Sequence, residues 1–244
     1  MNILPRYHLL LPLITIVLSS MCFIPLTSSH AAEQGINYKP PVNGTPARRI
    51  AAGSRGTCDN IKTLSPKFSL HTLAPDTVGY TLNAQPTLYW FLSEDVKGKF
   101  NLSIQPYNTE SMEEETVLID ENLLLDVKAG IQSLDLSRFS IKLEKGVEYE
   151  WFLSLVCNDE NRSQDIVANG MIKRIAPSPQ LTTHLNTVEK SQLAFSYAQY
   201  SLWYDAVDVL SHQIAQQPNN NQLVDVRSHL LRQGGLPENV STLN

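Results

Sequence analysis

One stretch in the middle of the chain, residues 147–157, constrains its fold more than any other. From Val147 to Cys157 every second residue is apolar, and Tyr149 and Trp151 lie on that face. Strict alternation over eleven residues predicts a β-strand with one face in a core, because successive side chains of a strand point to opposite sides. We therefore expect a core strand here, with Cys157 directed inward.

Segments with the same alternation recur between residues 67 and 176. They lie at 88–92, 100–104, 139–143 and 166–172, with shorter candidates at 116–120 and 131–136, and turn sequences separate them at 84–86, 96–98 and 144–146. Short strands at this spacing predict a mainly β fold, an antiparallel sandwich of two sheets. Because Tyr149 and Trp151 resemble the core strand of immunoglobulin-like modules, we expect an immunoglobulin-like β-sandwich over 67–176.

The pattern changes after the last expected strand. Two prolines indicate a linker over 177–186, and residues 187–235 switch to helical spacing with Thr187 as the expected N-cap. The first two helices resemble one tetratricopeptide unit, although Lys190 stands where that repeat has a tryptophan. The matching positions are Leu193, Ala194, Tyr197, Ala206, Leu210 and Pro218. A single unit cannot form a solenoid. We therefore expect a small C-terminal α-helical tail, this hairpin plus one helix, that docks on the sandwich or on another protein.

The first 31 residues carry the three-part pattern of a secretory signal peptide. Arg6 supplies the positive charge, an apolar run extends over 9–18 and resumes over 21–26, and Ser29 and Ala31 stand at the small-residue positions that signal peptidase reads. We expect cleavage after Ala31, and the alternative is an uncleaved membrane anchor. Beyond residue 32 no apolar run reaches spanning length, so we expect no membrane span after cleavage.

Two cysteines remain once the signal peptide, which holds Cys22, is removed. Cys58 and Cys157 would then lie in an oxidising compartment, where disulfides form and persist. We predict a disulfide between them, with two free thiols as the alternative. A catalytic dithiol would need a close C-x-x-C spacing, which the sequence lacks.

The segment 32–66 is rich in Pro, Gly, Asn and Ser, and we expect it to be extended rather than regular. It holds three arginines among glycines just before Cys58, namely Arg48, Arg49 and Arg55. Glycines can turn several backbone N–H groups toward one point, so this motif is a candidate anion site. The alternative is a segment that leads Cys58 to its partner, with its arginines solvated or paired with acids.

Charge and motifs exclude several classes of function. The chain carries 19 Lys and Arg against 24 Asp and Glu, a net charge of −5, which offers no electrostatic basis for binding nucleic acid. The sequence lacks the signatures of serine hydrolases, zinc proteases, phosphate-binding loops and calcium loops. The polar stretch 158–165 is either a calcium site or a solvated hairpin. We expect no enzymatic activity, no cofactor and no metal.

Four aromatic residues recur at helical spacing in the expected tail: Tyr197, Tyr200, Trp203 and Tyr204. Exposed rings on one helix face can stack on sugar rings, whereas rings turned toward a neighbouring element form a packing face. We single out Trp203 and Tyr204 as candidate interaction residues.

A series of short motifs follows in one order along residues 46–235. They are Arg48-Arg49-x-x-x-Gly53-Ser-Arg-Gly-x-Cys58, Leu73-x-Pro75, Gly79-Tyr80-Thr81, Pro86-Thr87 with Trp90-Phe91, Tyr149-x-Trp151 leading to Cys157, Gly170-x-Ile172-x-Arg174, and Leu202-Trp203-Tyr204-Asp205-Ala206. Their order resembles a family of exported, mostly cyanobacterial proteins catalogued as domain of unknown function number 928. The resemblance implies export and a shared architecture, and it implies no activity, substrate or catalytic residue.

Two positions depart from the pattern of that family. Ala51 and Ala52 stand where the family tends to have glycines, and Ser201 stands where a glycine is usual. The first departure weakens the anion-site interpretation, because fewer residues there tolerate a left-handed backbone.

Taken together, these features predict a periplasmic or secreted protein without enzymatic activity. We expect a protein-interaction module of the cell envelope, with an envelope protein as its partner. The alternative is a carbohydrate-binding module for surface or extracellular polysaccharide that uses exposed aromatic residues. A hydrolase on a sandwich scaffold is a third class, and no motif in the sequence supports it.

Overall fold

Two β-sheets and a layer of helices make up the part of the chain that can be described. The computed structural model describes residues 35–42, 44–46, 52–53, 58, 61, 64–107 and 119–241. One sheet contains, in order, β1 (Ala52–Gly53), β2 (Ser69–Thr72), β4 (Thr87–Leu92) and β7 (Gly130–Asp135). The other contains β3 (Gly79–Thr81), β9 (Ile166–Arg174), β8 (Glu148–Leu155), β5 (Val96–Pro106) and β6 (Ile119–Val127). All neighbouring strands are antiparallel except β3 and β9, which run parallel.

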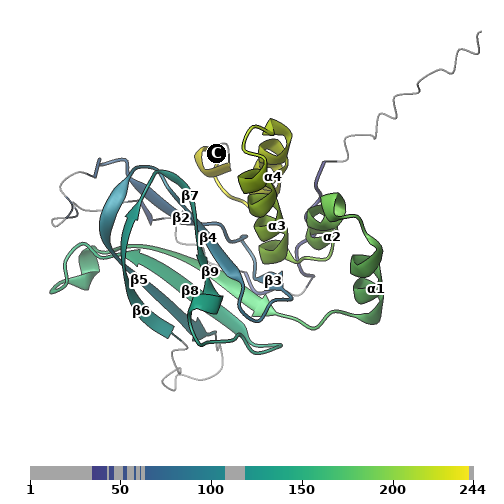
Figure 1. Ribbon diagram of the computed structural model, residues 1–244. Helices are drawn as coiled ribbons and strands as arrows, with labels where there is room; N and C mark the ends of the chain where they lie inside the picture. The colour runs from purple at the N-terminus through teal and green to yellow at the C-terminus, as the bar shows by residue number, and fades with distance from the viewer. Residues whose placement is uncertain are drawn as a thin grey trace, which may run out of the picture. The chain divides into compact units, whose positions relative to one another are not determined.

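The two sheets are joined along one side by a bent two-stranded ribbon (Figure 1). The pairing of β4 with β7 ends at Leu92 and Gly130, and the pairing of β5 with β6 begins at Val96 and Val127. Asp95 lies at the bend, where its carboxylate accepts a hydrogen bond from the Ala129 amide at 2.9 Å. The expectation of two mostly antiparallel sheets is confirmed, and the immunoglobulin-like arrangement stays a prediction.

The alternation read from the sequence is confirmed in the central strands. In β8 the side chains of Tyr149, Trp151, Leu153 and Leu155 are all buried, as expected. In β4, by contrast, all residues from Leu88 to Leu92 are buried. A strand loses its exposed face when both sides are covered, and here the helices cover the side that faces away from the other sheet.

The strand expected at 139–143 is wrong. These residues follow a short 3₁₀ helix, η1 (Leu136–Arg138), and they form no strand. Phe139 caps η1 by donating its amide to the Leu136 carbonyl, and Leu143 donates to the Ala84 carbonyl at 2.8 Å. Of the candidate at 116–120, residues 116–118 lie outside the described part, and the strand β6 continues to Val127.

The described residues contain roughly as much helix as strand, which corrects the expectation of a mainly β protein with a small helical tail. The helices are α1 (Pro179–Thr187), α2 (Leu193–Gln199), α3 (Trp203–Gln216), α4 (Asn221–Gln233) and α5 (Glu238–Ser241), with the 3₁₀ helices η2 (Arg162–Gln164) and η3 (Lys190–Gln192). Buried residues of the helices and of both sheets belong to one hydrophobic cluster. The helices are therefore part of the core. None of the helices in the described ranges is long and apolar enough to cross a membrane.

The expected linker is mostly a helix. Ser178 caps α1 by accepting a hydrogen bond from the Leu181 amide at 3.1 Å, and Pro179 occupies its first turn. Both residues favour helix starts, because proline lacks only an N–H that has no partner there. Thr187, expected as an N-cap, is the last residue of α1.

Helices α2 and α3 lie in the segment of the expected hairpin and pack against each other. The small residues Ala194 and Ala198 of α2 and Ala206 of α3 are fully buried. Helix α4 packs on α3 as the third helix (Figure 1). Small side chains let helix backbones approach closely, which explains why the tetratricopeptide-like spacing appears in the sequence.

The first turn of α3 attaches the helices to both sheets. The indole Nε1 of Trp203 donates to the Leu73 carbonyl, just after β2, at 2.7 Å. The hydroxyl of Tyr204 donates to the Met171 carbonyl on β9 at 3.0 Å. These two contacts set where the rest of α3 passes over the outer face of β4.

Candidate functional site

A cleft of about 310 Å³ lies between the strands β4 and β7 and the helices α3 and α4. Tyr89 pairs with Ser133, and Phe91 pairs with Ile131, so Tyr89, Ser133 and Ile131 point to the side of the sheet that the helices cover. The residues that line the cleft are Tyr89, Ile131, Gln132, Ser133, Ser211, His212, Ile214, Ala215 and Arg227. A mostly apolar cleft with a few converging polar groups is a typical ligand site.

Tyr89 supplies a buried hydroxyl group to the cleft. Its hydroxyl donates to the Asp208 carboxylate at 2.9 Å. Burial raises the pKa of Tyr89 far above its usual value, and the negative charge of Asp208 raises it further. Tyr89 therefore stays a neutral hydrogen-bonding group, and it is not available as a phenolate base.

Arg227 is the buried cation of the cleft. Only 5% of its surface is exposed, and burial lowers its pKa, while the nearby Tyr89 acts in the opposite direction. An arginine remains protonated under these conditions, because its pKa in water exceeds 12. A guanidinium beside hydroxyl groups is suited to bind a carboxylate.

His212 lines the cleft from α3 and contacts Asp208 on the same helix. His212 Nδ1 lies 2.9 Å from the Asp208 carbonyl and 3.4 Å from its carboxylate, and 64% of the histidine side chain is exposed. An ion pair this exposed contributes little to stability.

The cleft lies next to an open edge of a sheet. In the described ranges β7 pairs with β4 only, so its other edge is free. Charged residues flank this edge at Asp126, Lys128 and Asp135, whereas the stretch 131–134 between them carries no charge. Charges on edge strands hinder pairing with other chains, so the uncharged stretch beside the cleft is the part of this edge most open to a partner.

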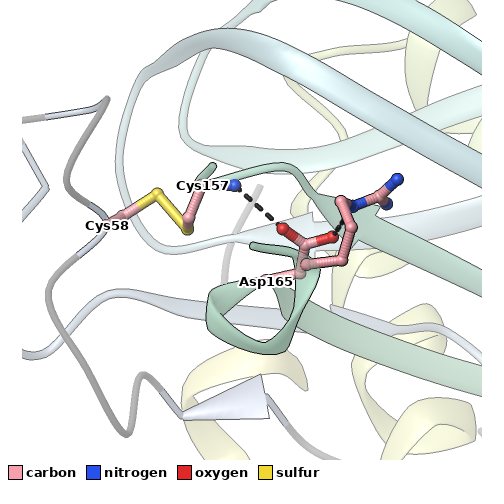
Figure 2. The surroundings of a disulfide bond; sticks show 4 residues. Cys58, Cys157 and Asp165 are labelled. Atoms are coloured by element: carbon pink, nitrogen blue, oxygen red, sulfur yellow. Dashed lines mark hydrogen bonds and ion pairs between the residues drawn. A yellow bond between two sulfur atoms is a disulfide. The ribbon is translucent and has the colours of Figure 1, made fainter. Parts of the chain in front are cut away.

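The predicted cysteine pair is brought together. The sulfurs of Cys58 and Cys157 are 2.10 Å apart, across 99 residues of sequence. Figure 2 shows Asp165 beside this disulfide, with one oxygen accepting from the Cys157 amide at 3.0 Å and the other from Arg162 Nε. Asn161 caps η2 in the same loop. The side-chain oxygens of Asn158, Asn161 and Asp165 thus accept hydrogen bonds from the protein itself, which favours the hairpin interpretation.

Of the five candidate interaction residues, the structure describes Trp203 and Tyr204. Arg48, Arg49 and Arg55 lie outside the described residues. Trp203 and Tyr204 are 0% and 2% exposed, so they form a packing face and the candidate interaction role is corrected. Their rings are buried because the first turn of α3 contacts both sheets. Of the four aromatic residues only Tyr200 is exposed, at 40%.

Sequence reasoning missed the residues of the cleft. They come from two strands and two helices, and no local motif links them. One signal was present at Arg227, a charged residue between Val224 and Leu231 on the buried face of α4.

Comparison with known protein families identifies the family of this chain. The family model described as Domain of Unknown Function (DUF928) matches residues 50–243. No curated protein matches the chain.

Proposed function

The chain belongs to the DUF928 family, and from this premise we propose that it is an exported, non-enzymatic protein-interaction module of the cell envelope. Two features support export. The first 31 residues have the pattern of a signal peptide, and a disulfide persists only where thiols are not kept reduced. The site of interaction is the cleft together with the open edge of β7.

The single observation that carries this proposal is the position of a buried cation beside an unpaired, uncharged strand edge. Arg227 lines the cleft that Ile131, Gln132 and Ser133 of β7 border. An extended partner segment can add to a sheet edge through main-chain hydrogen bonds and place a side chain in an adjacent pocket. The positive charge of Arg227 in the lining of the cleft favours an acidic side chain there, because opposite charges attract strongly where water is scarce.

The proposal is tested by photo-crosslinking in cells, with the crosslinker placed either at the cleft or at a position away from it. A photoreactive amino acid replaces Ser133, which is exposed on β7, and in a matched control it replaces Asn219, which is exposed in the turn between α3 and α4. We expect one recurrent envelope protein to be crosslinked from position 133 and not from position 219. Mass spectrometry identifies it.

Two outcomes of this experiment contradict the proposal. The first is an identical set of crosslinked proteins from both positions. The second is a crosslink from position 133 to glycan alone, which favours the carbohydrate-binding alternative. A titration of tryptophan fluorescence with polysaccharide fragments is then the next measurement.

A further inference from the structure

An extended segment near the N-terminus, Gly35–Lys39, lies on the helices, and we call it the strap. Its main chain is held by two side chains and one carbonyl of the helical layer. Gln233 accepts from the Tyr38 amide at 2.6 Å and donates to the Ile36 carbonyl at 2.6 Å. The Lys39 amide donates to the Ala198 carbonyl at 3.1 Å, and the Ser201 hydroxyl donates to the Lys39 carbonyl at 2.6 Å. A single glutamine amide thus pairs with both an N–H and a C=O of the strap.

Two side chains of the strap are inserted into the protein. Ile36 is 1% exposed and Tyr38 is 5% exposed. The Tyr38 ring packs edge-on against Trp203, with ring centroids 4.8 Å apart. Burying two large apolar side chains stabilises the contact between the strap and the helices. The strap therefore has the two components of peptide recognition, main-chain hydrogen bonds for affinity and pockets for alternate side chains for specificity.

Ser201 is under backbone strain at this contact. It is the non-glycine residue with a positive φ, 64°, among the described residues. A left-handed backbone is unfavourable for a serine, and a glycine would avoid this cost. The serine side chain supplies the hydroxyl that binds the Lys39 carbonyl. Strain of this kind is found where a residue serves a binding role.

The strap and the groove that holds it belong to different parts of the chain. Ala198, Ser201, Trp203 and Gln233 all lie within the family match at 50–243, whereas the strap lies before it. We propose that this groove is a binding site for extended peptides with the pattern aliphatic, any residue, aromatic, and that the strap is its occupant within the same chain. The two prolines after Lys39 support this role, because a residue before proline is restricted to extended conformations.

The test adds the sequence of the strap as a separate peptide. In the full chain, Ile36 and Tyr38 are both replaced by serine, and binding of a fluorescent peptide with the sequence Gly-Ile-Asn-Tyr-Lys-Pro-Pro is measured by anisotropy. We expect saturable binding to this variant, and binding at least about tenfold weaker to the unmodified protein, whose own strap competes. A peptide with serine in place of the isoleucine and tyrosine should not bind.

A second substitution in the same background tests the groove itself. Gln233→Ala should weaken peptide binding by about tenfold, because it removes both main-chain contacts. Gln216→Ala, at an exposed position of α3, is the matched control and should leave binding unchanged.

Three results overturn the inference. The first is that no peptide binds to a serine variant that keeps the circular dichroism of the unmodified protein. The second is that the peptide binds the unmodified protein as tightly as it binds the serine variant. The third is that Gln233→Ala leaves peptide binding to the serine variant unchanged. If the serine variant does not fold, its thermal unfolding is followed with and without excess peptide. Recovery of a cooperative transition with the peptide, and not with its serine analogue, supports the inference, and no recovery overturns it.

Discussion

The indole Nε1 of Trp151 donates a hydrogen bond to the hydroxyl of Tyr204 at 2.9 Å, and that hydroxyl donates in turn to the Met171 carbonyl at 3.0 Å. Trp151 lies on β8, Met171 on β9 and Tyr204 on α3. Both aromatic side chains are fully buried. One hydroxyl group therefore satisfies two buried polar groups of the five-stranded sheet and fixes the first turn of α3 on it.

Removing this hydroxyl should destabilise the fold. Tyr204→Phe leaves the Trp151 N–H and the Met171 carbonyl without this partner, and a buried polar group left unsatisfied costs about 1–3 kcal/mol. The free energy of unfolding, measured by urea denaturation, should fall by that amount. The control is Tyr200→Phe, at an exposed position, which should change it by less than about 0.5 kcal/mol. Equal effects of the two substitutions would show that the buried hydroxyl is not important.

Asp205 should make stability depend on pH. Burial raises the pKa of Asp205 to about 6, although hydrogen bonds from the Leu82 amide and the Thr81 side chain act to lower it. The pKa of this carboxyl is therefore higher in the folded state than in the unfolded state, where it is about 3.9. Its contribution is therefore fully present below pH 4 and is lost as the pH rises through 6.

The size of this effect follows from the shift. The free energy of unfolding should fall by about 3 kcal/mol between pH 3 and pH 7 on account of this group. Asp205→Asn should remove that slope, whereas Asp126→Asn, at an exposed position of β6, should keep it. Urea denaturation at several pH values measures both, and an unchanged slope in Asp205→Asn contradicts the prediction.

Reducing the disulfide should lower stability strongly. The bond between Cys58 and Cys157 closes a loop across 99 residues, and the loss of such a constraint on the unfolded chain costs about 4–5 kcal/mol. The urea midpoint of the unmodified protein should decrease in the presence of a reductant. The double variant Cys58→Ala with Cys157→Ala should be less stable and insensitive to the reductant. A midpoint that the reductant leaves unchanged argues against a structural role for the bond.

Ser201 should respond differently to glycine and to alanine. Glycine relieves the positive φ and loses the hydroxyl bond to Lys39, two effects of about 1 kcal/mol each that oppose one another. Alanine loses the bond and keeps the strain, so Ser201→Ala should be less stable than Ser201→Gly by about 1 kcal/mol. Thermal unfolding measures the order, and the reverse order contradicts the strain described at this residue.

The elements that could be predicted are those whose signal is local. The alternation from Val147 to Cys157 reports the two faces of a strand directly, and β8 forms as expected. The cysteine pairing follows from the expected removal of Cys22 with a signal peptide, which leaves two cysteines, and it needs no knowledge of the fold. The start of α1 is also encoded locally, by Ser178 and Pro179, although prolines there are equally typical of a linker.

The candidate site could not be predicted in the same way. Tyr89 and Arg227 line one cleft although they lie on a strand and a helix far apart in the sequence. Trp203 and Tyr204 have a spacing that suits an exposed face as well as a packed one, and their burial depends on contacts with Leu73 and Met171. Such contacts are set by distant segments, so periodicity alone cannot distinguish the two.

By itself the sequence determined which segments alternate, which cysteines can pair and where helices can begin, because backbone periodicity and capping act over a few residues. Only the tertiary structure decided that the helices belong to the core, that the strap lies on Gln233 and Ser201, and that a cleft opens beside β7. These features arise when surfaces distant in the sequence pack against each other, and the free energy of that packing depends on all the partners at once.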